Sequence, residues 1–218
     1  MNGDMVVINH ATKTIGGVDV LADITMSIPR GATVILRGTN GSGKTMLLRL
    51  MCGLVQASEG SVVVDGRQLG RDCDFPPSVG VFLERPAFDG GRSGLSNLRC
   101  LASIRGRVGE NEVCDAMRRM GLDPSLKKPF RTYSLGMRQR LGIAAALMEE
   151  PDLVLLDEPG NALDEQGRAL LIEALGRERS RGATLVIATH DLVTTKIRHD
   201  LLVRLAEGHV EKIEGMGQ

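Results

Sequence analysis

A glycine-rich turn near the N-terminus constrains this chain more than any other feature of its sequence. Residues 38–45 read Gly-Thr-Asn-Gly-Ser-Gly-Lys-Thr and match the phosphate-loop pattern G-x-x-x-x-G-K-[ST] in full. The β-branched run Thr33–Leu36 precedes this turn, and apolar residues at helical spacing follow it (Leu47, Leu50, Met51 and Leu54). A strand, a glycine loop and a helix in this order favour a phosphate site over an ordinary glycine turn.

The residue types in the loop have the chemistry needed to hold a triphosphate. Glycine lets backbone N–H groups turn toward a phosphate, and the positive end of the following helix adds to their field. Lys44 supplies a cation for the β- and γ-phosphates, and the Thr45 hydroxyl is a ligand for Mg²⁺. The predicted binding residues are Gly38, Thr39, Asn40, Gly41, Ser42, Gly43, Lys44 and Thr45.

Two acidic residues end a second apolar strand. Leu153–Leu156 is followed directly by Asp157 and Glu158, and ligands of open α/β sheets bind at the carboxyl ends of the strands. Asp157 is predicted to hold Mg²⁺ through its water shell, and Glu158 to act as the general base toward an attacking water. The alternative is an acidic strand end at a solvated edge, and the phosphate loop favours the catalytic interpretation.

The remaining pattern predicts an α/β fold. Helical and buried-strand segments alternate between residues 141 and 188, which is typical of a mostly parallel sheet. Short alternating segments near the N-terminus predict an antiparallel β layer, and the segment 201–213 predicts a closing hairpin. Residues 89–149 predict an inserted helical lobe, so that a single domain has its core at about 1–88 and 150–218.

Composition argues against a nucleic-acid-binding protein and against a membrane-spanning protein. The 27 Lys and Arg balance the 27 Asp and Glu, so no net positive charge favours nucleic acid, and the four Phe and one Tyr form no aromatic platform for single strands. The apolar runs are much shorter than the roughly 20 residues of a membrane-spanning helix. The start of the chain lacks the basic region of a signal peptide, so we expect a cytoplasmic protein.

The segment Tyr133-Ser-Leu-Gly-Met-Arg-Gln-Arg140 completes a familiar order of motifs. It stands where ABC-transporter ATPases have their LSGGQ signature, and the whole chain resembles that family. The resemblance implies a P-loop NTPase (RecA-like) core, hydrolysis of ATP with Mg²⁺, a second ATPase subunit and separate transmembrane subunits. Ser134 and Gly136 match residues that bind the ATP held by the other subunit, although a serine here is also a good helix N-cap.

The same resemblance implies roles for two further residues. Asp164 ends the segment that corresponds to the D-loop, near ATP, but it is equally suited to capping the next helix. His190 follows the switch strand Thr184–Thr189, where the family's histidine contacts the γ-phosphate and orients the water.

The signature departs from the family consensus at Tyr133, Leu135 and Met137, and the sequence departs from the family at two further sites. Glu84 replaces the usual glutamine of the Q-loop, so a carboxylate is expected among the catalytic residues and Mg²⁺ ligands, where it attracts the metal and repels phosphate. Ile15 stands where an aromatic ring commonly stacks on adenine, and an aliphatic side chain loses stacking worth about 0.5 to 1.5 kcal/mol.

The segment around Glu84, the following Pro86–Phe88 and the Tyr-Ser-Leu-Gly-Met signature look like the bacitracin-resistance and lantibiotic-immunity ATPases. This resemblance implies a homodimeric or heterodimeric ATPase on the inner face of the cell membrane that drives export of antimicrobial peptides. The main alternative is a non-transport ABC ATPase acting on nucleic-acid or translation complexes. Such proteins usually carry coiled coils or two ATPase domains, and this sequence has neither heptads nor a repeat.

Overall fold

A six-stranded sheet forms the centre of the structure, a computed structural model that describes residues 3–83, 86–190 and 197–215. Its strand order is β10-β9-β3-β8-β7-β6. All neighbours pair in parallel except the hairpin of β9 and β10. The strands are β3 (Thr33–Arg37), β6 (Val79–Phe82), β7 (Leu153–Asp157), β8 (Thr184–Thr189), β9 (Leu201–Ala206) and β10 (His209–Gly215). The predicted α/β architecture is therefore confirmed.

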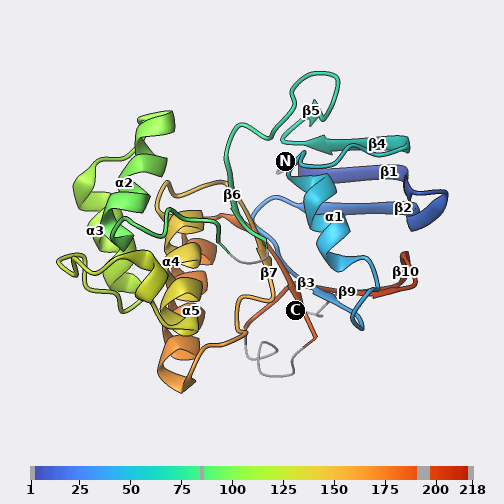
Figure 1. Cartoon of the computed structure of the whole chain (residues 1–218). Coiled ribbons are helices and arrows are strands. Elements are labelled where there is room, and N and C mark those ends of the chain that lie inside the picture. The colour runs from blue at the N-terminus through green and yellow to red at the C-terminus, as the bar shows by residue number, and fades with distance from the viewer. Residues whose placement is uncertain (1–2, 84–85, 191–196, 216–218) are drawn as a thin grey trace.

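A second, antiparallel sheet has the strand order β2-β1-β4-β5 and lies on the right of Figure 1 with α1. Its strands are β1 (Asp4–Ile15), β2 (Val18–Pro29), β4 (Glu59–Val64) and β5 (Arg67–Gln68). The sequence pattern did not predict β5, which has only two residues, or β6, whose four residues include a glycine. These short elements depend on pairing with neighbouring strands more than on their own pattern.

Helices cover both faces of the six-stranded sheet. One core joins α1 and the antiparallel sheet to residues such as Leu153 and Leu155, while the other joins the remaining helices to Val154 and Leu156. Because β7 is buried on both faces, its first four residues, Leu153–Leu156, are apolar without alternation. The helices are α1 (Lys44–Met51), α2 (Gly94–Arg105), α3 (Glu110–Arg119), α4 (Leu135–Leu147) and α5 (Glu165–Ser180). Among the residues described, no helix has the length and apolar character required to cross a membrane.

Helix α4 packs against β6 with no space for a larger residue. A Cβ atom on Gly80 would lie 2.0 Å from the Ala146 carbonyl oxygen, and one on Gly142 would lie 2.5 Å from Phe82 Cε2. The position of α4 relative to the sheet is therefore fixed by close backbone contact.

Gly80→Ala is expected to lower the free energy of unfolding by about 1 to 3 kcal/mol, because α4 must move away from the sheet. Urea denaturation measures this change. Gly176→Ala is the matched control, since a Cβ there meets nothing within 4 Å, and alanine in this helix should stabilise by about 0.5 to 1 kcal/mol. Equal stabilities of the Gly80→Ala variant and the parent would contradict the close packing.

Candidate functional site

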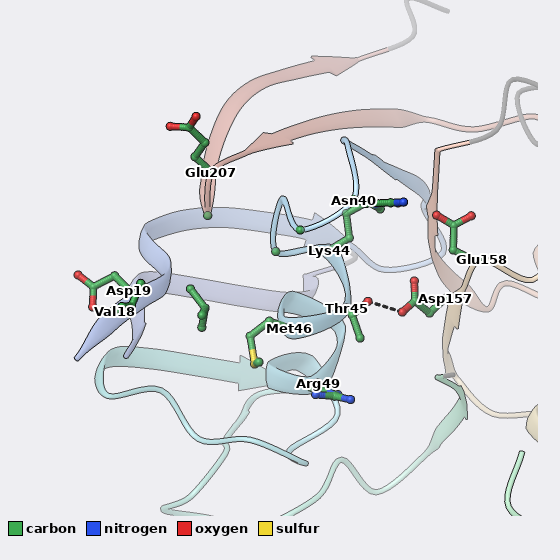
Figure 2. A pocket seen from close by; sticks show the side chains of 14 residues that line it. Val18, Asp19, Asn40, Lys44, Thr45, Met46, Arg49, Asp157, Glu158 and Glu207 are labelled. Atoms are coloured by element: carbon green, nitrogen blue, oxygen red, sulfur yellow. Dashed lines mark hydrogen bonds between the residues drawn. The ribbon is translucent and has the colours of Figure 1, made fainter. Parts of the chain in front are cut away.

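The glycine-rich loop connects β3 to the first turn of α1, as Figure 2 shows from close by. Gly41 and Gly43 have φ angles of 83° and 100°, in the left-handed region that glycine adopts readily. A Cβ atom on Gly43 would also lie 2.8 Å from Leu21 Cδ2. The buried Ser42 hydroxyl has no hydrogen-bond partner in the described part of the chain. The loop therefore leads into a helix start, where the first N–H groups lack partners within the helix and can bind an anion.

The Lys44 side chain folds back over this loop. Its Nζ donates hydrogen bonds to the Gly38 carbonyl at 2.8 Å and to the Thr39 carbonyl at 3.0 Å, and the residue is only 6% exposed. Both acceptors are uncharged, so the ammonium keeps its positive field toward the adjoining cavity. An anion there would interact with a charge that is already partly desolvated.

The predicted metal ligands Thr45 and Asp157 meet directly. Thr45 Oγ1 donates a hydrogen bond to Asp157 Oδ2 at 2.5 Å, which joins the first turn of α1 to the carboxyl end of β7 (Figure 2). A hydroxyl and a carboxylate are hard oxygen donors of the kind that Mg²⁺ prefers, and together with Lys44 and the helix-start N–H groups they fit a phosphate chain with its metal. The third predicted ligand, Glu84, lies outside the described residues.

Glu158 and His190 also lie in contact. His190 Nδ1 is 2.6 Å from Glu158 Oε1, at the ends of the adjacent strands β7 and β8. Glu158 has a φ of 47°, an uncommon value for a residue other than glycine, and its N–H donates to the Ala188 carbonyl at 2.9 Å. Such backbone strain concentrates at functional sites. A carboxylate beside an imidazole is a pair of the kind that general acid–base chemistry uses.

One cavity of about 590 Å³, a size typical of small-molecule sites, is lined by Lys44, Thr45, Asp157 and Glu158. Ser42 and His190 are not among its lining residues. Ile15 is not among the lining residues, and its side chain is half exposed at the end of β1. Val18, which pairs with it across the hairpin, lines the cavity instead, as does Arg49 from α1. Helical spacing from Thr45 could have indicated Arg49, but no sequence signal indicated Val18. The lining residues are Val18, Asp19, Val20, Asn40, Gly41, Gly43, Lys44, Thr45, Met46, Arg49, Asp157, Glu158, Glu207 and Gly208.

Besides Ile15, Gly38, Thr39 and Ser42, three other predicted ATP-binding residues are absent from the lining of this cavity, and these three lie at helix starts. Ser134 caps α4 and accepts a hydrogen bond from Met137 N–H at 3.2 Å. Asp164 caps α5 and accepts one from Gly167 N–H at 2.8 Å. Gly136 lies in the first turn of α4. The structure thus shows the capping roles and does not bring these residues to the loop of their own chain.

Comparisons with known proteins agree with this geometry. The family described as ABC transporter matches residues 21–161. An uncharacterized ABC transporter ATP-binding protein of Bacillus subtilis, YybJ, is 38% identical over 96% of this chain and 96% of its own length. The bacitracin transport ATP-binding protein BcrA of Enterococcus faecalis is 36% identical over 92% of this chain and 66% of its own length.

Two further similarities extend the comparison. The lantibiotic transport ATP-binding protein SrtF of Streptococcus pyogenes is 33% identical over 94% of this chain and 89% of its own length. Among solved structures, a dimeric bacterial ABC transporter cassette superposes with a TM-score of 0.89 over 98% of this chain and all of its own, at 22% identity. At that identity the superposition shows the fold alone.

Proposed function

The chain belongs to the ABC transporter family of ATP-binding ATPases, and from this premise we propose that it drives export of antimicrobial peptides through separate membrane subunits. It is an ATPase that uses ATP with Mg²⁺. The observation that carries the finer proposal is the similarity to two relatives named for bacitracin and lantibiotic transport, each covering more than nine tenths of this chain. Both named cargoes are peptide antibiotics.

We propose the following division of roles at the cavity. The loop N–H groups and Lys44 bind the β- and γ-phosphates, while Thr45 and Asp157 hold Mg²⁺, which supplies positive charge to the phosphate oxygens when bound. Glu158 accepts a proton from the attacking water at a carboxylate oxygen. His190 orients that carboxylate through its contact at 2.6 Å. Support comes from the hydrogen bond between Thr45 and Asp157 and from the contact between Glu158 and His190, both at the carboxyl ends of parallel strands.

A second copy, or a related chain, is proposed to complete the site. Ser134 is exposed at the start of α4, and a hydroxyl with helix-start N–H groups forms an anion site. Because this site does not face its own loop, the terminal phosphate it binds belongs to ATP on the other subunit. The proposed position of the pair is the inner face of the cell membrane, against the transmembrane subunits.

Drug-susceptible bacteria that express this chain with its membrane subunits test the peptide proposal. Resistance to bacitracin or to a lantibiotic should increase with the parent chain and not with the inactive Glu158→Gln variant. Membranes prepared from the bacteria with the parent chain should release phosphate from ATP faster when the peptide is added. Normal ATP hydrolysis without resistance or stimulation by either peptide would refute the proposed cargo and leave the ATPase assignment intact.

A further inference from the structure

Gln139 connects helix α4 to the backbone of the proposed general base. Its Nε2 donates hydrogen bonds to the carbonyl oxygens of Glu158 and Pro159, each at 3.2 Å. A glutamine in a predicted helix ordinarily faces solvent, so the sequence alone gave no sign of this contact. Gln139 and Glu158 also line a cavity of about 260 Å³, together with Phe82, Leu135, Asp157, Asn161 and Ala162.

The Gln139 contact restrains the carbonyl of Glu158, in addition to the contacts that restrain its N–H and its carboxylate. The Glu158 N–H is bonded to β8, and its carboxylate contacts His190. Its carbonyl accepts from Asn161 N–H at 3.1 Å within the following turn and from Gln139 across the fold. Of these partners, Gln139 alone comes from α4, the helix that Ser134 caps.

The start of α4 touches the same turn a second time. A Cβ atom on Gly136 would lie 3.0 Å from the Ala162 carbonyl oxygen, so the helix and the turn are in close backbone contact. A displacement of α4 must therefore act on the turn that carries Glu158. Glu158 adopts an uncommon left-handed φ, and such a conformation persists only where surrounding contacts hold it, so the contacts on its N–H and its carbonyl also hold the direction of its side chain.

We propose that Gln139 is a positioning residue that couples the placement of α4 to the orientation of the Glu158 carboxylate. The proposal rests on the proposed function, in which a second subunit's ATP binds at the start of α4. Binding there fixes the helix, and the two Gln139 hydrogen bonds transmit that position to the base. Gln139 is not among the residues that line the cavity beside the glycine-rich loop.

The test compares two neighbouring residues of α4. Gln139→Met keeps the side-chain length and removes both donors, and it should lower kcat for ATP hydrolysis about tenfold while KM for ATP changes less than about twofold. Arg140→Met is the matched control, because Arg140 Nη1 also donates to two carbonyls, those of Met120 and Gly121, away from Glu158. The control should keep kcat within about twofold of the parent.

A second measurement does not depend on hydrolysis. Amide hydrogen exchange of the segment 158–164 should accelerate in Gln139→Met and stay unchanged in Arg140→Met, since only the first variant releases that turn. Equal kcat in Gln139→Met and the parent, equal losses in both variants, or unchanged exchange in the segment would overturn the proposal. A parent chain that hydrolyses no ATP even with its membrane subunits contradicts the proposed function instead, and the exchange measurement then still tests the contact.

Discussion

Replacing Glu158 with glutamine is expected to lower the turnover number for ATP hydrolysis at least about 100-fold. Glutamine keeps the size of the side chain and can remain near His190, but its amide cannot accept the proton that the attacking water releases. ATP binding should survive, because the loop, Lys44 and the Thr45–Asp157 pair are unchanged. Phosphate release under saturating ATP and Mg²⁺ measures the turnover number, and filter binding measures the retained nucleotide.

The same variant should accumulate as an ATP-bound pair of chains, visible by size-exclusion chromatography only when ATP and Mg²⁺ are present. Glu207→Gln is the matched control. Glu207 lines the same cavity, but it lies across the view of Figure 2 from Glu158 and Asp157. The control should hydrolyse ATP like the parent. Parent-like turnover in Glu158→Gln would remove Glu158 from its role as general base.

The fold was predictable where the sequence pattern is local. The buried strands β7 and β8 are apolar at nearly every position, and the loop between β3 and α1 has residue types that its backbone angles require. Strand β6 was not predicted, because a four-residue segment that contains Gly80 shows little alternation of polar and apolar residues. That glycine is explained only by the helix packed against it. Tertiary contact, not local preference, sets such an element.

The candidate site likewise contains residues that a local sequence pattern predicts and contacts that only the tertiary structure shows. Thr45, Asp157, Glu158 and His190 were predictable because each follows a strand or loop whose type is clear, and parallel strands bring their carboxyl ends to one edge. The contact of Gln139 with Glu158 joins residues 19 positions apart on different elements, so no local pattern contains it. The choice of Val18 over Ile15 as a cavity residue depends likewise on how the hairpin of β1 and β2 is seated against the loop.

Lys44→Met is expected to weaken ATP binding about 100-fold or more. Two charge-assisted hydrogen bonds to phosphate oxygens contribute about 1.5 to 3 kcal/mol each, and each 1.4 kcal/mol changes the dissociation constant tenfold. In the parent chain the Nζ atom already sits in the loop, held by the Gly38 and Thr39 carbonyls. Methionine has a similar length but leaves those carbonyls without this donor and the cavity without its ammonium. Isothermal titration with ATP and Mg²⁺ measures the change.

Lys212→Met controls for the loss of a lysine elsewhere, because Lys212 is exposed on β10 and pairs with Glu214 at 2.7 Å. Its ATP affinity should equal that of the parent. The two variants then separate ATP binding from hydrolysis. Lys44→Met weakens binding and thereby hydrolysis, whereas Glu158→Gln slows hydrolysis and retains binding. A Lys44→Met chain that binds ATP as tightly as the parent would mean that the loop N–H groups alone hold the phosphates, and the electrostatic part of the site would have to be assigned to other residues.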